Sequence, residues 1–187
     1  MHPGSIPGQA SKFPMTEIPT GAAKTSFPAV ADARTRVLIL GSLPGEVSLR
    51  KAQYYAHPQN QLWRLMEPVI GRPLADAPYE ARLERLHEAG VGLWDVIRSA
   101  RRVGSLDAAI RDHMPNRLAE FIAGLPELRA IGFNGGKASQ IGRKALAAVE
   151  GGPALITLPS SSPAHASVPF AGKQAAWLAL KAFLQDD

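Results

Sequence analysis

A long polar segment, residues 41–60, holds the densest group of side chains that could do chemistry in this chain of 187 residues. Its second half, residues 54–60, reads Tyr-Tyr-Ala-His-Pro-Gln-Asn. Tyrosine rings offer flat faces on which a base can stack, at about 1–3 kcal/mol per base. The Asn60 amide can bond a polar edge or orient a water molecule. It is equally suited to cap a following helix while the tyrosines fill the core, so both interpretations stay open.

A second polar segment, residues 158–165, reads Leu-Pro-Ser-Ser-Ser-Pro-Ala-His. Short hydroxyls and exposed backbone N–H groups suit phosphate oxygens. The prolines restrict the chain, which lowers the entropy lost when the loop is held against a ligand. The same residues are common in plain turns, and one histidine alone does not indicate catalysis. This segment therefore predicts either a phosphate contact or a simple turn.

A third polar segment begins at Asn134 and reads Asn-Gly-Gly-Lys before a predicted helix. Helix N-termini attract anions. The glycine spacing matches neither the dinucleotide-binding fingerprint nor the P-loop. A structural turn is the favoured interpretation of this segment, and a mononucleotide site stays open.

Four short apolar segments predict the strands that must position these loops, at residues 37–40, 91–94, 129–133 and 154–158. Apolar spacing and capping residues predict helices from about residue 60 and at residues 79–88, 117–124, 137–149 and 171–185. Strands alternating with helices predict one three-layer α/β domain, with a central four-stranded, mainly parallel sheet flanked by helices. Ligands of such sheets bind beyond the carboxyl ends of the strands, where all three loops fall.

The composition is that of a globular protein, with 45% hydrophobic and 20% charged residues. The absence of cysteine excludes disulfides, Fe–S clusters and thiolate zinc sites. The five histidines show no metal-binding spacing, so we expect no metal and no cofactor. Lys and Arg exceed Asp and Glu by 21 to 16, and the net charge of +5 favours a polyanionic partner such as nucleic acid.

The first residues differ in character from the rest of the chain. Residues 1–26 are rich in Pro, Gly and Ser, which predicts a flexible tail before a domain that spans residues 27–187. They contain no apolar signal-peptide core, and the aliphatic run at residues 37–40 is far too short to span a membrane. We therefore expect a cytoplasmic monomer with no membrane partner.

Taken together, the loops resemble those of the uracil-DNA glycosylase superfamily. Residues 41–45 (Gly-Ser-Leu-Pro-Gly) and 55–63 (Tyr-Ala-His-Pro-Gln-Asn-Gln-Leu-Trp) resemble the first motif of its mismatch-specific group. Residues 158–160 (Leu-Pro-Ser) occupy the place of the superfamily's second motif. The Gly-Ser-x-Pro start, the tyrosine pair and the Leu-Pro-Ser-Ser-Ser-Pro-Ala segment most resemble the hypoxanthine (deoxyinosine) DNA glycosylase family, from residue 27 to the C-terminus.

Two positions depart from the superfamily pattern. Leu43 stands where a water-activating Asp or Asn is usual, and Leu158 stands where the second motif has His or Asn. Neither leucine can do acid–base chemistry. In the hypoxanthine family the catalytic polar role passes to an Asn of the aromatic segment, and Asn60 is the matching position.

The resemblance implies a monofunctional DNA glycosylase that removes deaminated bases from damaged DNA in base excision repair. Hypoxanthine is the expected base, with uracil or xanthine as further substrates, and Asn60 is the expected catalytic residue. The residues expected to bind the flipped base are Ser42, Leu43, Pro44, Tyr55, His57 and Asn134. The residues expected to contact DNA are Ser160, Ser161, Ser162, Pro163 and His165.

Two other functions stay open. The leucines at both usual catalytic positions are compatible with a non-catalytic nucleic-acid-binding module of the same fold. A small-molecule nucleoside hydrolase is the third interpretation, although its usual Asp-rich calcium cluster is not visible in the sequence. Lys51 is the one lysine of the first loop and is expected to face solvent, so we expect no lyase activity through a Schiff base.

Overall fold

A computed structural model of the chain describes residues 23–186. The predicted flexible tail, residues 1–26, therefore falls almost entirely outside the described residues. Its last part is ordered, because strand β1 (Ala23–Thr25) pairs antiparallel with strand β4 (Ile97–Arg101). The described fold thus includes residues 23–26, which the prediction assigned to the tail.

Four parallel strands form the central sheet, in the order β3-β2-β6-β7. They are β2 (Val37–Gly41), β3 (Val91–Asp95), β6 (Ala130–Asn134) and β7 (Ala154–Leu158). All four lie where the apolar segments predict them. Strands β2 and β6 are buried along their whole length. Helices on both faces explain why these strands are apolar at every position rather than at alternate ones.

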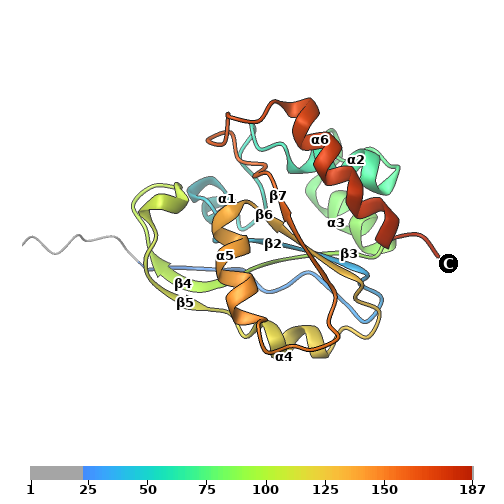
Figure 1. The fold of residues 1–187 in the computed structure, drawn as a ribbon. Helices are drawn as coiled ribbons and strands as arrows, with labels where there is room; N and C mark the ends of the chain where they lie inside the picture. Colours follow the sequence, from blue (N-terminus) through green and yellow to red (C-terminus); the bar gives the residue numbers. More distant parts are fainter. Residues whose placement is uncertain (1–22, 187) are drawn as a thin grey trace, which may run out of the picture.

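Helices cover the two faces of this sheet as separate layers (Figure 1). One face carries α2 (Leu62–Ile70), α3 (Tyr79–Glu88), α6 (Phe170–Leu178) and the 3-10 helix η2 (Ala179–Phe183). The other carries α4 (Leu118–Ala123) and α5 (Gly136–Ala145). The predicted three-layer α/β architecture is confirmed, with α5 ending four residues earlier than predicted.

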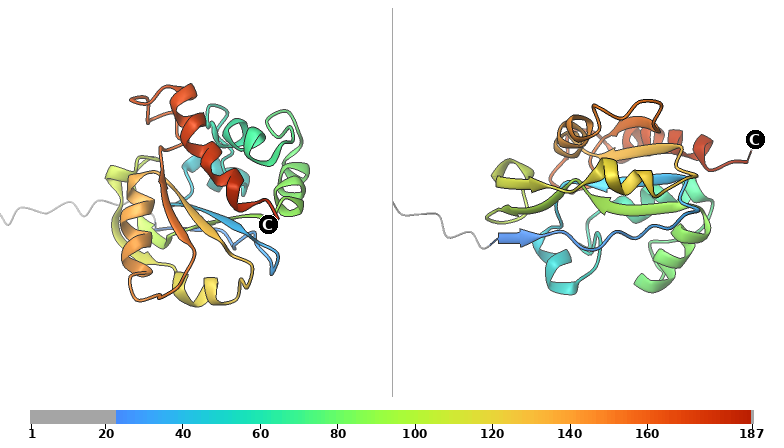
Figure 2. Two further views of the ribbon diagram at one scale, coloured as in Figure 1. Left: turned by 45° about the vertical axis from the view of Figure 1, so that its right-hand side comes forward. Right: turned by 90° about the horizontal axis from the view of Figure 1, so that it is seen from below.

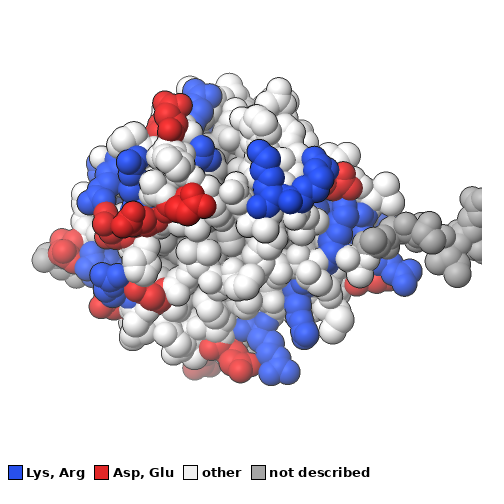
Figure 3. Space-filling model, turned by 180° about the vertical axis from the view of Figure 1, so that it is seen from behind, with Lys and Arg blue, Asp and Glu red and all other residues white. Residues whose placement is uncertain are grey.

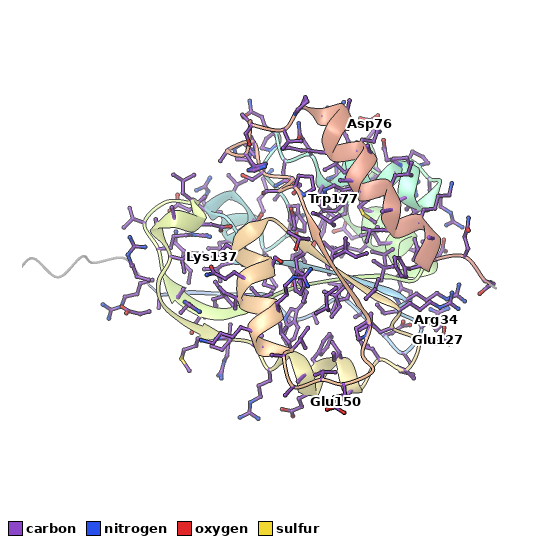
Figure 4. The ribbon with its side chains drawn as sticks, viewed as in Figure 1. Arg34, Asp76, Glu127, Lys137, Glu150 and Trp177 are labelled. Carbon is purple, nitrogen blue, oxygen red and sulfur yellow. The ribbon has the colours of Figure 1, made fainter. Side chains whose placement is uncertain are left out.

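Each layer has its own hydrophobic core, and strand β2 contributes to both. Val37 and Ile39 pack with residues of α2, α3 and α6, whereas Leu38 and Leu40 pack with residues of α4 and α5. This alternation follows from the two-residue period of a strand. Trp177 points inward from α6 (Figure 4), and its Nε1 donates a hydrogen bond to the Pro159 carbonyl at 2.9 Å. The α6 layer is thereby tied to the loop that follows β7.

A second, antiparallel sheet extends from one end of the molecule, in the order β1-β4-β5 (Figure 2). Strand β5 (Arg111–Pro115) is exposed along its whole length. The sequence does not predict β4 or β5, because both are short, rich in polar residues and lack a continuous apolar run. Two short helices are also unpredicted, namely α1 (Glu46–Lys51) and the 3-10 helix η1 (Asp107–Ala109). Helix α1 occupies part of the segment expected to be a loop.

Candidate active site

The carboxyl ends of the parallel strands meet at one cleft of about 580 Å³. Strands β2, β3 and β6 end there at Gly41, Asp95 and Asn134, and the loop after β7 forms the facing wall. All the residues predicted for the site line this cleft, namely Ser42, Leu43, Pro44, Tyr55, His57, Asn60, Asn134, Ser160, Ser161, Ser162, Pro163 and His165. The three loops thus form a single site, as the strand-end rule predicts.

Arg102 holds the first loop of the cleft from behind. Its side chain donates hydrogen bonds to the carbonyls of Leu43, at 3.2 Å, and of Pro44. Its Nε donates to the Gly104 carbonyl at 3.0 Å, and the residue is only 2% exposed. Burial lowers the pKa of Arg102, while Asp107 acts to raise it. A buried, planar guanidinium with several carbonyl partners fixes the shape of this loop.

The Leu43 N–H of this loop has its direction set by the Ser42 carbonyl, which belongs to the same peptide bond. The Ser42 carbonyl accepts a hydrogen bond from the Ile97 N–H at 3.1 Å. In a trans peptide the C=O and N–H point in opposite directions, so the N–H of Leu43 points away from Ile97. Among residues 23–186 this N–H has no hydrogen-bond acceptor. The Leu43 side chain lies in the α4–α5 core, and the Ser42 hydroxyl donates to Asp107 Oδ1 at 2.6 Å.

Asn60 lies half-buried in the wall of the cleft, one residue before Gln61, which begins α2 as its cap. Its Oδ1 accepts a hydrogen bond from the Leu62 N–H at 3.0 Å. The structure thus places the helix cap at Gln61, one residue after the predicted cap, and the Asn60 side chain accepts a backbone N–H at the helix start. This hydrogen bond fixes the orientation of the Asn60 amide, because only the oxygen can accept from a backbone N–H. Its Nδ2 has no acceptor within the described part of the chain, so a hydrogen-bond donor is left for a ligand.

Tyr55 places its hydroxyl at the deep end of the cleft. Its backbone is left-handed, with φ of 52°, and its carbonyl accepts from Trp63 Nε1 at 3.1 Å. The two rings pack edge to face, with centroids 6.4 Å apart. The hydroxyl is buried and has no hydrogen-bond partner among the described residues. Burial raises the pKa of Tyr55 well above its usual range, Asp95 raises it further, and Asn134 acts to lower it.

Asp95 shares this deep end and was not predicted as a site residue. It is 3% exposed, and its Oδ2 has no hydrogen-bond partner within residues 23–186. Burial raises the pKa of Asp95 to about 7, although Arg102 acts to lower it and Asp107 to raise it. A β-carbon on Gly41 would lie 2.8 Å from Asp95 Oδ1 and 3.0 Å from the Tyr55 hydroxyl oxygen. The glycine therefore makes room for a carboxyl group and a phenol side by side.

The serine loop is anchored through Asn134. The Asn134 Nδ2 donates to Ser161 Oγ at 2.8 Å, and the Ser161 N–H donates to Asn134 Oδ1 at 2.8 Å. The Ser161 carbonyl accepts from the Gln61 N–H at 3.0 Å. Ser161 is fully buried, with its polar groups engaged inside the protein. This corrects the prediction that Ser161 contacts DNA, because its role in the structure is to hold the loop against β6.

The other residues of the serine loop remain accessible at the rim. Ser160 and Ser162 are half-buried and Pro163 is exposed. The Ser162 carbonyl accepts from the His165 N–H at 3.1 Å, which closes a tight turn around Pro163. On the opposite rim, His57 is exposed and its Nδ1 accepts from the Gln59 N–H at 3.1 Å. The rim thus offers hydroxyl, amide and imidazole groups to a ligand at the mouth.

A second groove adjoins the cleft and is lined by basic side chains. It shares Asn60 and His165 with the cleft and adds Arg64 and Lys173. Arg64 is exposed, and its guanidinium lies over the Phe170 ring at 4.3 Å from the centroid. Lys173 is 2% exposed, and its Nζ donates to a single partner, Gln61 Oε1, at 3.0 Å. Burial lowers the pKa of Lys173.

No helix between residues 23 and 186 is long and apolar enough to cross a membrane. The same residues contain no group of three or more His, Cys, Asp or Glu side chains placed to hold a metal ion.

Fold and site together define an α/β protein with a cleft at the carboxyl edge of a parallel sheet. The family model described as the uracil DNA glycosylase superfamily matches residues 27–182. The chain therefore belongs to the uracil DNA glycosylase superfamily. The Leu43 and Leu158 departures thus lie within a genuine member of this superfamily.

Individual proteins similar to this chain include two curated enzymes and one solved structure. Two curated proteins named hypoxanthine DNA glycosylase, from Methanosarcina barkeri and Methanosarcina acetivorans, are 44% and 46% identical to the chain. Each match extends over 117 residues, which is 63% of this chain and 74% of the relative. A solution NMR structure from Methanosarcina acetivorans, described as that of a candidate uracil DNA glycosylase, has a TM-score of 0.77 at 40% identity. That match covers 87% of this chain and 99% of the other.

Proposed function

We propose that this protein is a monofunctional DNA glycosylase that hydrolyses the N-glycosidic bond of a deaminated base, with hypoxanthine as its main substrate. The observation that carries the proposal is one cleft in which the Asn60 donor, the Leu43 N–H and the buried pair Asp95 and Tyr55 converge. Membership of the superfamily and the two relatives named hypoxanthine DNA glycosylase support it.

The damaged nucleotide would leave the helix and enter the cleft, at a cost of a few kcal/mol for unstacking. The base is the free end of the flipped nucleotide, so it reaches the deep end near Asp95 and Tyr55. The sugar stays joined to the DNA backbone and lies closer to the rim. Asn60, which is half-buried in the wall, is then beside the sugar and the glycosidic bond.

The reaction breaks the bond between the sugar C1′ and the base nitrogen, and the electron pair leaves with the base. A water molecule then adds to the oxocarbenium-like C1′ and releases a proton. Preorganised N–H donors stabilise the negative charge that develops on the leaving base. The Leu43 N–H and Asn60 Nδ2 are two donors of the cleft wall that have no acceptor among residues 23–186. Because an amide is not a strong base, stabilisation of the leaving group carries the step.

The roles of the remaining predicted residues follow from their place in the cleft. Pro44, His57 and the second N–H of Asn134 would line the base pocket. Tyr55 would contribute both its ring face and its buried hydroxyl. At the rim, Ser160, Ser162, Pro163 and His165 would contact the DNA strand. Ser161 supports them from inside the protein.

The flanking phosphates would lie along the second groove, where the exposed Arg64 supplies positive charge. Figure 3 shows the face behind that of Figure 1, where basic side chains form separate groups beside acidic ones. That face has no single basic stripe that would offer the DNA backbone an alternative to the groove. Lys137, at the first turn of α5 (Figure 4), adds a cation at the edge of the cleft.

The proposal is tested by strand cleavage after alkali treatment of duplex DNA that contains inosine, uracil or xanthine. We expect the inosine strand to be cleaved fastest. Cleavage in EDTA, and elution as a monomer in gel filtration, would match an enzyme that needs no metal or partner copy. Fractionation of the source cells tests the expected cytoplasmic location.

A non-catalytic DNA-binding module is the second candidate, and the core positions of Leu43 and Leu158 favour it. It predicts retention of lesion DNA with no cleavage of any lesion. A nucleoside hydrolase instead predicts release of base from free inosine and little affinity for DNA. The same protein preparation distinguishes the three functions when both assays are run.

A further inference from the structure

We propose that Asp95 and Tyr55 form a base-reading pair that accepts the lactam edge of hypoxanthine or uracil and rejects the amidine edge of adenine or cytosine. The inference rests on the proposed function and names the feature of the base that the cleft selects. It assigns a specificity role to Asp95, a residue that the sequence motifs leave without one.

The two groups are built as an unfilled polar site. Asp95 Oδ2 and the Tyr55 hydroxyl are the buried side-chain atoms of residues 23–186 that have no hydrogen-bond partner. Buried polar atoms are otherwise almost always paired, so both await a partner from outside the chain. Asp95 Oδ1 and the Tyr55 hydroxyl meet above Gly41, where any side chain would strike both. Both residues line the cleft, which places them beside a ligand that enters it.

The chemistry of deamination matches this pair. Adenine presents an N1 lone pair beside an amino group, whereas hypoxanthine presents an N1–H beside the C6 carbonyl. A carboxylate accepts only and a phenol can donate. Asp95 therefore accepts the N1–H while Tyr55 donates to the carbonyl oxygen. The same N–H and carbonyl arrangement occurs in xanthine and uracil, and also in guanine and thymine, so the pair selects against adenine and cytosine. Adenine would place its N1 lone pair against the carboxylate, and sites built on such hydrogen bonds reject the wrong partner strongly.

The charge on Asp95 makes the selection depend on pH. The charged or titratable groups that act on Asp95 are Arg102, Asp107 and the hydroxyls of Tyr54 and Tyr55. Burial dominates and raises the pKa of Asp95 to about 7. Above this pH the ionised carboxylate accepts the lactam N–H. Below it the protonated group can donate to adenine N1, so discrimination weakens as the pH falls.

The test compares single-turnover excision from duplexes that differ only in inosine or adenine at one position. For Asp95→Asn we expect the inosine-to-adenine rate ratio at pH 8 to fall at least about tenfold, because the amide can donate to adenine N1. The fall in the wild-type ratio between pH 8 and pH 6 should be absent in this variant. Asp76→Asn is the matched control, since Asp76 is exposed and lies outside the cleft.

Tyr55→Phe provides a second, independent arm. It removes the unpartnered hydroxyl and keeps the ring beside Trp63, so it should fold and melt at least as high as the wild type. We expect inosine excision to fall about tenfold with adenine excision unchanged. Unchanged rate ratios in either folded variant would overturn the base-reading pair. If the wild type cuts no inosine DNA, the proposed function fails, and the same variants then report on selection through their affinities for the two duplexes.

Discussion

The Asn60 Oδ1 accepts the Leu62 N–H at 3.0 Å, so one side chain both begins helix α2 and lines the cleft. The two roles use different atoms of the amide. The oxygen satisfies a backbone donor that would otherwise lack a partner at the helix start. The nitrogen has no acceptor among residues 23–186 and is left as a donor in the cleft wall. Structural and chemical roles of Asn60 can therefore be separated by substitution.

Asn60→Asp keeps the cap and removes the donor, because a carboxylate accepts from the Leu62 N–H as well as an amide oxygen does. We expect a melting temperature close to that of the wild type. Single-turnover excision of hypoxanthine should fall by roughly 100- to 1,000-fold, the usual effect of losing one donor to a developing charge. Asn60→Ala should lose a similar factor and about 1 kcal/mol of stability as well. Wild-type excision by Asn60→Asp would show that the free donor is not what catalysis needs.

Gly41→Ala tests the close packing at the deep end of the cleft. The added carbon would meet Asp95 Oδ1 at 2.8 Å and the Tyr55 hydroxyl at 3.0 Å, so one of the two groups must shift. We expect lower stability and loss of hypoxanthine excision, measured by thermal melting and single-turnover assays. Gly136→Ala serves as the stability control, because a β-carbon there meets no atom within 4 Å. Equal melting temperatures for the two variants would contradict the predicted clash.

The buried Asp95 also makes the stability of the protein depend on pH. Its pKa is about 7 in the folded state against an ordinary value of 3.8, so the folded state binds more protons between these values. The stabilising contribution is complete below pH 3.8 and is lost as the pH rises through about 7. Its size is on the order of 4 kcal/mol. The melting temperature of Asp95→Asn should therefore exceed that of the wild type by more at pH 8.5 than at pH 5. A pH-independent difference would argue against the raised pKa.

The central sheet and the location of the site could be predicted from sequence because both follow from local patterns. Continuous apolar runs mark strands that are covered on both faces, as in β2 and β6. The loop chemistry then falls at the carboxyl ends by topology alone. Asn60 was identifiable as a cap and as a site residue, yet only the structure shows which atom serves each role.

The deep end of the cleft was harder to predict, because its groups come together only in three dimensions. Asp95 follows an apolar strand directly, in the same position as Asn134 on its own strand, and that placement was the available signal. Arg102 had no such signal, since it lies beyond β4 in the unpredicted sheet and reaches back to the first loop through space. Ser161 looked like its neighbours in sequence, and only its burial against Asn134 sets it apart.

Arg64 provides a test of the path that DNA takes across the surface. It is exposed in the basic groove beside the cleft, where it would neutralise one phosphate. For Arg64→Ala we expect weaker binding of both lesion and undamaged duplexes, and a reduction of about one in the slope of log affinity against log salt concentration. Arg34→Ala is the matched control, because Arg34 is equally exposed and pairs with Asp32 away from the cleft. Fluorescence anisotropy between 50 mM and 200 mM salt measures both slopes. An unchanged slope for Arg64→Ala, or an equal loss for Arg34→Ala, would place the DNA backbone elsewhere than in this groove.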